Sequence, residues 1–351
     1  MMRLIGSFSS LVVVGLIAVF GWQSYQQFRK PVDLRFVVTS WPTAHLVSAV
    51  AARGFFTTHR LNVKIINVGD DYDAALRAVQ DGQADGGIFP LSDPLLLTLQ
   101  NVPMRIVLGV DYSAGADGIV AASEVKQFSD LKGRRVAYQE GSYGDFLLRE
   151  GLRRAGLTMN DVTGVPQNNQ DVVQSFLQGK VDAAATFQPF LDQALRRSGS
   201  TLLFSSEALP GLLPDVIAFR KDVVSSKRPA ITSFLSAWFD GINELNKESK
   251  PRREMLAVVA ISNGTTIANV ENSLTTIKLF NFMDNAIAFT YANDLLSLYR
   301  SSQEFMNFHG GFSEESINRV ISEVIDPSFV RSGLRESATG SRLCLSDQTC
   351  P

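Results

Sequence analysis

The loop Gly141-Ser142-Tyr143-Gly144 has the composition of an anion-binding turn. Glycine lets the backbone approach a ligand closely, and the free N–H groups at the start of a following helix attract negative charge. Ser142 adds a hydroxyl donor. A sulfonate or carboxylate group would suit such a loop. An alternative interpretation is that Ser142 or Tyr143 only caps the helix, and the sequence leaves both open.

Other loops add an aromatic ring and carboxylates to this set. Trp41 is expected at the end of a strand, where it could form a flat wall or a cation–π face for a ligand, or could pack into a core. Asp93, Asp117 and Asp215 lie in or beside similar loops. One of them could hold an ammonium group on the ligand, although helix-capping and hinge roles are equally open. Donors together with carboxylates favour an amino-bearing anion over plain nitrate.

Catalytic and metal chemistry is not indicated. The three histidines, His45, His59 and His309, are scattered singly along the chain. None falls in a Ser–His–Asp order or at the spacing of a metal-binding motif. We therefore predict that the protein is not an enzyme and that it has no cofactor and no metal site.

The composition is that of an ordinary globular protein. The 351 residues are 45% hydrophobic and 19% charged, which suits two lobes that each bury a core. The 33 Lys and Arg against 35 Asp and Glu give a net charge of −2. A nucleic-acid-binding protein usually carries a basic excess, so nucleic acid is not an expected partner.

An internal repeat predicts the architecture. Residues 78–96 and 175–193 share one plan: a helix ending at glycine (Gly82, Gly179), then an aspartate (Asp85, Asp182), a run of small apolar residues, a proline and another helix. Each of these segments is preceded by another, residues 34–54 and 134–156 respectively, and these two share a strand, a polar loop and a helix. A chance match of common α/β patterns is the alternative.

We predict an α/β protein with two lobes, each a mostly parallel sheet flanked by helices, and a helical C-terminal part. The C-terminal helices are expected at residues 229–248, 251–262, 267–280, 289–308 and 313–323. In open α/β sheets a ligand lies outside the carboxyl ends of the strands. The predicted ligand-binding residues at these ends are Trp41, Thr43, Ser92, Asp93, Ser113, Asp117, Gly141, Ser142, Tyr143, Thr186, Gln188 and Asp215.

The two termini carry separate signals. Residues 4–22 form an uncharged, apolar run that is just long enough to span a bilayer, and the end of the run is a poor cleavage site. We expect residues 1–30 to hold an uncleaved membrane anchor, with a cleaved signal peptide as the alternative. Cys344 and Cys350 lie in a polar tail, 336–351, and form either a disulfide or two free thiols.

Several segments occur in an order that is typical of one protein family. These are Trp41-Pro42, Ala52–Phe56, Asp111–Asp117, Leu131–Ala137, Gly141-Ser142, Thr186–Pro189, Leu209–Gly211, Pro214–Val216 and Ile325–Val330. In this order they resemble the ABC-transporter substrate-binding proteins of the nitrate/sulfonate/taurine type, with the periplasmic binding protein type II fold. Phe187-Gln188 replaces the family's usual Trp-Glu, which leaves the identity of the ligand open.

The resemblance implies a division of the chain and a function. Lobe 1 would hold residues 33–115 and 212–335, and lobe 2 residues 116–211. The protein would be the solute-binding component of an ABC uptake system and close on a small organic anion or zwitterion such as a sulfonate, taurine or nitrate. Its partners would be a permease and an ATPase, and it would act in the periplasm, anchored in the inner membrane by residues 4–22. A membrane-tethered ligand sensor and a binder of a thiamine-precursor pyrimidine are the alternatives.

Overall fold

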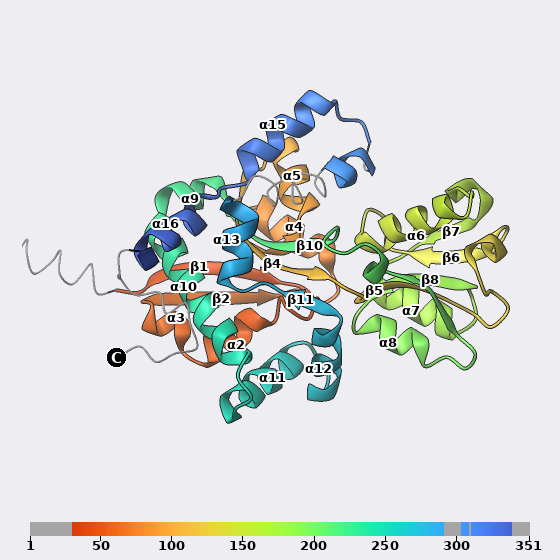
Figure 1. Cartoon of the computed structure of the whole chain (residues 1–351), viewed down its shortest axis with the longest axis horizontal. Helices are drawn as coiled ribbons and strands as arrows, with labels where there is room; N and C mark the ends of the chain where they lie inside the picture. The colour runs from red at the N-terminus through yellow and green to blue at the C-terminus, as the bar shows by residue number, and fades with distance from the viewer. Residues whose placement is uncertain (1–29, 291–302, 309, 339–351) are drawn as a thin grey trace, which may run out of the picture.

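Two β-sheets, each covered by helices, form the framework of the molecule (Figure 1). The computed structural model describes residues 30–290, 303–308 and 310–338. The predicted N-terminal anchor and the two cysteines lie outside these ranges. Within them, no helix has the length and apolar character that crossing a membrane requires.

The first sheet has six strands in the order β11-β4-β10-β3-β1-β2. Their bounds are β1 Val32–Val38, β2 Leu61–Asn67, β3 Gly86–Pro90, β4 Met104–Ser113, β10 Pro214–Arg220 and β11 Ile277–Leu279. The pairs of β1 with β2 and β3 are parallel, whereas β10 runs antiparallel to β3 and β4. We call this sheet with its helices the first lobe.

The second sheet has five strands in the order β7-β6-β8-β5-β9. Their bounds are β5 Asp117–Ala121, β6 Arg135–Tyr138, β7 Thr163–Pro166, β8 Ala183–Phe187 and β9 Thr201–Ser205. β6 is parallel to β7 and β8, and β5 is antiparallel to β8 and β9. This sheet with its helices is the second lobe.

The expected α/β class is confirmed, with the difference that both sheets are mixed rather than mostly parallel. The reason lies in the route of the chain. It leaves the first sheet after β4, enters the second at β5, and returns from β9 to β10 through a short 3₁₀ turn at Ser206–Ala208. β5 and β10 are the first strands after the two crossings between the lobes. They pair antiparallel with β8 and β3, which themselves belong to parallel pairs. The lobe boundaries given above stay a prediction.

The repeated aspartates have the same structural role in both lobes. Asp85 Oδ2 accepts a hydrogen bond from the backbone N–H of Arg35, in the middle of β1, at 2.8 Å. Asp182 Oδ2 accepts from the N–H of Arg135 at 2.9 Å. The glycines before them, Gly82 and Gly179, both have positive φ, at 68° and 71°, which glycine adopts without steric cost. The sequence repeat therefore corresponds to a repeated β-α-β arrangement.

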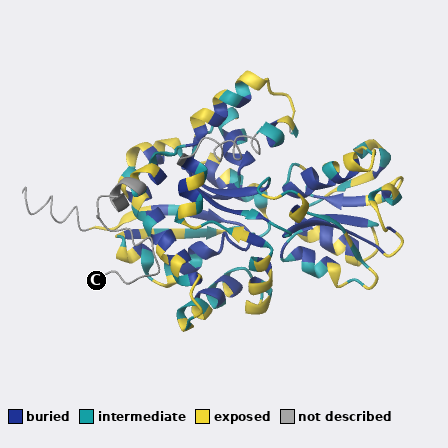
Figure 2. Ribbon diagram, viewed as in Figure 1, coloured by how far each residue is buried: buried dark blue, intermediate teal, exposed yellow. Residues whose placement is uncertain are grey.

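Helices cover both faces of each sheet, and their outer sides are exposed while the strands are buried (Figure 2). In the first lobe they are α2 Leu46–Ala52, α3 Phe55–Thr58, α4 Tyr72–Gln80, α5 Ser92–Leu99, α9 Lys221–Ser226, α10 Arg228–Leu245, α11 Lys250–Ser262, α12 Ile267–Thr275, α13 Phe282–Thr290, α15 Glu314–Val324 and α16 Ser328–Ala338. In the second lobe they are α6 Tyr143–Arg154, α7 Asn169–Leu177 and α8 Phe190–Leu195, with 3₁₀ turns at Phe128–Leu131 and Met159–Asp161.

One helix prediction was wrong. The helix expected at 267–280 ends at Thr275, and residues 277–279 form β11, which pairs antiparallel with the edge of β4. The β-branched run Thr275-Thr276-Ile277 disfavours a helix and suits a strand, and β4 offers it an unpaired edge. A helix over 282–290 follows, and residues 291–302 of the helix expected at 289–308 lie outside the described part of the chain.

A short helical segment at 303–308 connects the lobes in a way that the sequence does not reveal. Phe305 is 1% exposed and belongs to the core of the second lobe, although the chain around it packs on the first. Its ring stacks on Phe146 of α6, with 4.6 Å between centroids, and meets Tyr143 edge-on at 4.7 Å. The lobes are therefore linked by this aromatic contact as well as by the two crossings.

Candidate functional site

A cavity of about 70 Å³ lies where the loops of the two lobes meet. It is bounded by the loops that follow β1, β2 and β3 in the first lobe and by the loop between β6 and α6 in the second. These loops stand at the carboxyl ends of parallel strands, where ligands of α/β proteins usually bind. The cavity is the candidate ligand-binding site.

Eight of the twelve predicted site residues line this cavity. They are Trp41, Ser92, Asp93, Asp117, Gly141, Ser142, Tyr143 and Asp215. The structure gives the position of these residues at the cavity, and their role in binding stays a prediction. The rule that ligands bind at the carboxyl ends of strands, here called the strand-end rule, predicted these residues together because it depends only on the order of strands and loops.

The other four predicted residues are buried beside the cavity and bond to protein groups. Thr43 donates to Asp111 Oδ2 at 2.5 Å, and Gln188 Nε2 donates to Asp192 Oδ1 at 2.7 Å. The Ser113 hydroxyl lies 2.6 Å from that of Ser206, and Thr186 is fully buried with its hydroxyl 3.4 Å from Asn169 Oδ1. Ser113 and Ser206 thereby join the two chain crossings, a structural role that no sequence motif indicates.

Several lining residues were not predicted, and they include Tyr72, Gln139, Asn169 and Phe187. Tyr72 follows β2, a strand that the sequence analysis did not identify. Its hydroxyl donates to Asp93 Oδ2, which ties α4 to the start of α5. Applying the strand-end rule to the alternating segment Leu61–Asn67 would have found this loop.

The Ser142 hydroxyl is occupied by contacts within its own loop. It donates to the Gln139 carbonyl at 2.7 Å and accepts from the N–H of Asp145 at 3.3 Å, as an N-cap of α6 does. The N–H of Gly141 donates to Asp145 Oδ2 at 3.0 Å. These bonds account for the loop as a helix start, and they use two of the donors that an anion would need.

Trp41 and Phe187 pack edge to face at the wall of the site. Their ring centroids are 5.5 Å apart at an interplanar angle of 61°, and they come from the first and the second lobe respectively. Both line the cavity. This pair gives the site an aromatic wall to which each lobe contributes one ring.

Tyr143 bridges the two lobes at the other side of the cavity. Its hydroxyl donates to the carbonyl of Pro214 at 2.5 Å and accepts from the N–H of Leu91 at 3.1 Å. Tyr143 belongs to the second lobe, whereas Leu91 and Pro214 belong to the first. These contacts, together with a bond from Asn272 Nδ2 to Asp192 Oδ2 at 2.6 Å, join the two lobes on either side of the cavity.

Burial changes the acidity of the aspartates around the cavity. It raises the pKa of Asp93 from 3.8 to about 8 and that of Asp117 to about 7. The pKa of Asp215 lies well above its ordinary value, because of burial first and then the nearby charges of Asp111 and Asp117. Asp111, behind the cavity wall, has its pKa raised to about 6 by burial, which its hydrogen bond from Thr43 partly offsets.

The sequence model of one protein family matches residues 43–250, which is more than half of the chain and includes nearly all of these site residues. The chain belongs to the NMT1/THI5-like family. A curated relative in Brucella abortus, described only as a binding protein, is 26% identical over 309 residues, or 88% of this chain and 87% of its own. The resemblance noted from the sequence motifs is thereby confirmed at the level of family and fold.

Solved structures share the fold of this NMT1/THI5-like protein. The alkanesulfonate-binding protein of Xanthomonas axonopodis pv. citri superposes with a TM-score of 0.64 at 21% identity, covering 79% of this chain and 93% of its own. The periplasmic nitrate-binding protein of Synechocystis PCC 6803 gives 0.70 at 13% identity, covering 89% and 91%. A desulfurization enzyme gives 0.61 at 14% identity, covering 87% and 99%. The same architecture thus serves binding proteins and at least one enzyme.

Proposed function

We propose that this protein is the solute-binding component of an ABC-type uptake system and closes its two lobes on a small molecule outside the cytoplasm. The observation that carries the proposal is a cavity enclosed by loops from both lobes, with Tyr143 bonded to backbone groups of the opposite lobe. Such bonds exist only when the lobes are together, so they favour the closed state in which a ligand would be trapped.

The likeness to sulfonate- and nitrate-binding proteins supports this role. An uptake role would require a separate permease and ATPase as partners. Among the described residues that line the cavity there is no histidine or cysteine, and the described structure holds no cluster of ligands for a metal ion. A desulfurization enzyme with the same fold makes activity the outcome to exclude by experiment.

Two linked measurements test the proposal. Native mass spectrometry of the freshly purified protein should detect a small molecule that is carried through purification. Small-angle scattering should then show a smaller radius of gyration with that molecule than after its removal by unfolding and refolding. Equal radii at saturation, with tight binding confirmed, would refute closure, and chemical conversion of the bound molecule would refute a pure binding role.

A further inference from the structure

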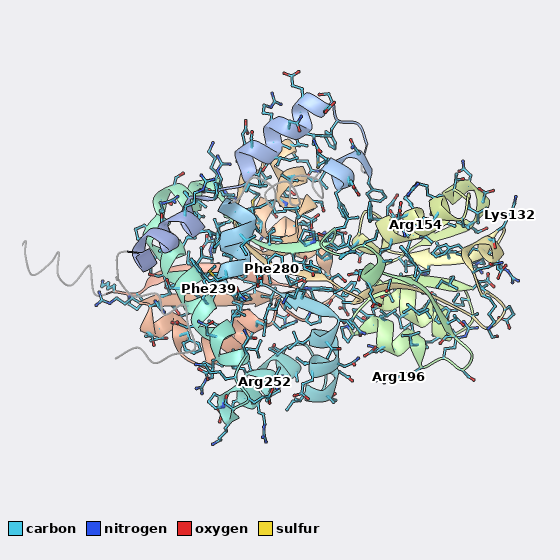
Figure 3. The ribbon with its side chains drawn as sticks, viewed as in Figure 1. Lys132, Arg154, Arg196, Phe239, Arg252 and Phe280 are labelled. Carbon is cyan, nitrogen blue, oxygen red and sulfur yellow. The ribbon has the colours of Figure 1, made fainter. Side chains whose placement is uncertain are left out.

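The ionisable side chains that line the cavity are acidic. Asp93, Asp117 and Asp215 line it with side chains that are 8%, 2% and 4% exposed, and the half-buried Asp70 joins them. No lysine, arginine or histidine is among the described residues that line the cavity. Basic side chains such as Lys132, Arg154 and Arg196 lie instead on the outer surface of the second lobe (Figure 3).

One of these carboxylates has an unused oxygen. Asp117 Oδ2 is buried and has no hydrogen-bond partner within the described chain. The backbone N–H of Asp117 is directed elsewhere, to the hydroxyls of Ser113 at 3.1 Å and Ser206 at 3.3 Å. A buried acceptor without a donor is costly, so this oxygen indicates that an N–H or O–H donor of a ligand belongs beside it.

The neighbouring carboxyls are differently placed. Asp93 accepts hydrogen bonds from the hydroxyls of Tyr72 and, at 3.2 Å, Ser92. Asp215 lies close enough to Asp117 and Asp93 for their charges to act on its own ionisation. A cationic donor at Asp117 would lower the pKa values of these three buried carboxyl groups, and once ionised they would surround it with negative charge in a poorly solvated space.

The aromatic side chains of the cavity agree with a positive ligand. Trp41 and Phe187 both line the cavity, and the face of an aromatic ring carries negative partial charge to which ammonium groups bind well. An anion such as a bare sulfonate would find no basic partner among the described residues that line the cavity.

From this juxtaposition we infer that the cavity binds a small organic molecule through a primary or secondary ammonium group, with Asp117 as its direct acceptor and Asp93 and Asp215 supplying the surrounding negative charge. The inference rests on the proposed function and specifies the chemical class of its ligand. It narrows the expectation of an organic anion or zwitterion to ligands that carry an amine. A cavity of about 70 Å³ accommodates a small group of this kind.

A matched set of probes tests the inference on the full chain. Propylammonium, 1-propanol and propanesulfonate share one alkyl chain and differ in charge, and potassium chloride controls for ionic strength. At pH 8, propylammonium should raise the melting temperature more than the other three. Because a cation drives protons off carboxyls that are protonated in the empty cavity, calorimetry in two buffers of different ionisation heat should also detect proton release on binding.

Variants assign the effect to the cavity. Asp117→Asn keeps the shape of the side chain but removes its charge, and it should weaken propylammonium binding roughly 10- to 100-fold. Asp222→Asn is the control, since that carboxylate is 67% exposed and pairs with Arg220 away from the cavity. The titratable groups facing the ligand are Asp70, Tyr72, Asp93, Asp117, Tyr143 and Asp215.

The outcomes separate this inference from the proposed function. A larger stabilisation by propanesulfonate than by propylammonium, equal effects of amine and alcohol, or unchanged amine binding in Asp117→Asn would each overturn the inference. The solute-binding role would survive those results if the molecule retained through purification still compacts the protein. If no retained molecule compacts it while propylammonium binds as expected, the amine site stands and the closure mechanism fails.

Discussion

Replacing Asp93 by asparagine should make the stability of the ligand-free protein less sensitive to pH. The carboxyl group is 8% exposed, and burial raises its pKa from 3.8 to about 8. A carboxyl with a raised pKa in the folded state holds a proton that the unfolded chain releases. Its contribution to stability is therefore fully present below about pH 4 and is lost as the pH rises toward 8.

The magnitude follows from these two pKa values. Between pH 6 and 8 the unfolded carboxyl is ionised throughout, whereas the folded one keeps its proton until close to pH 8. Each pH unit with one proton of difference costs about 1.4 kcal/mol, so the loss over this interval is about 2 kcal/mol for Asp93. For a protein of this size that corresponds to a fall in melting temperature of about 3 °C.

Thermal unfolding of the refolded, ligand-free protein at pH 6, 7 and 8 measures this effect. The wild type should lose more than the Asp93 share, because Asp117 and Asp215 also have raised pKa values. Between pH 6 and 8 the Asp93→Asn variant should lose less stability than the wild type, by about the amount calculated. The Asp222→Asn variant should lose as much stability as the wild type. If Asp93→Asn loses as much as the wild type, the carboxyl is already ionised in the folded state and the reasoning is refuted.

Two further substitutions test the contacts between the lobes. Tyr143→Phe removes one net hydrogen bond, because the carbonyl of Pro214 keeps the N–H of Leu91 as a donor at 3.0 Å. The loss of about 1 kcal/mol should weaken binding of the retained ligand about 5-fold in calorimetry. An unchanged affinity would show that this bond does not stabilise closure. Phe305→Ala should lower the free energy of unfolding by about 3–5 kcal/mol in denaturant titration, because the buried ring packs against Phe146. A loss below about 1 kcal/mol would contradict that packing.

The amino-acid sequence determined the local plan of this protein. Glycines at helix ends, aspartates that follow them and short apolar runs repeat in two places, and each pair has the same geometry in the structure, as Asp85 and Asp182 show. Local signals of this kind depend on a few consecutive residues. Because the strand-end rule needs only their order, it also located most of the residues that now line one cavity.

How these parts meet, and which polar atoms they leave unpaired, depends on contacts between segments that lie far apart in the sequence. Residues 277–279 form a strand because the edge of β4 is available to them, and Phe305 joins the core of the other lobe across more than 150 positions of sequence. Thr43 and Ser113 are bonded to partners from distant segments, Asp111 and Ser206, whereas Gln188 bonds to Asp192 four residues along the chain. The raised pKa values of Asp93 and Asp117 likewise come from burial. Burial depends on all the segments that pack around these residues, so no single segment predicts it.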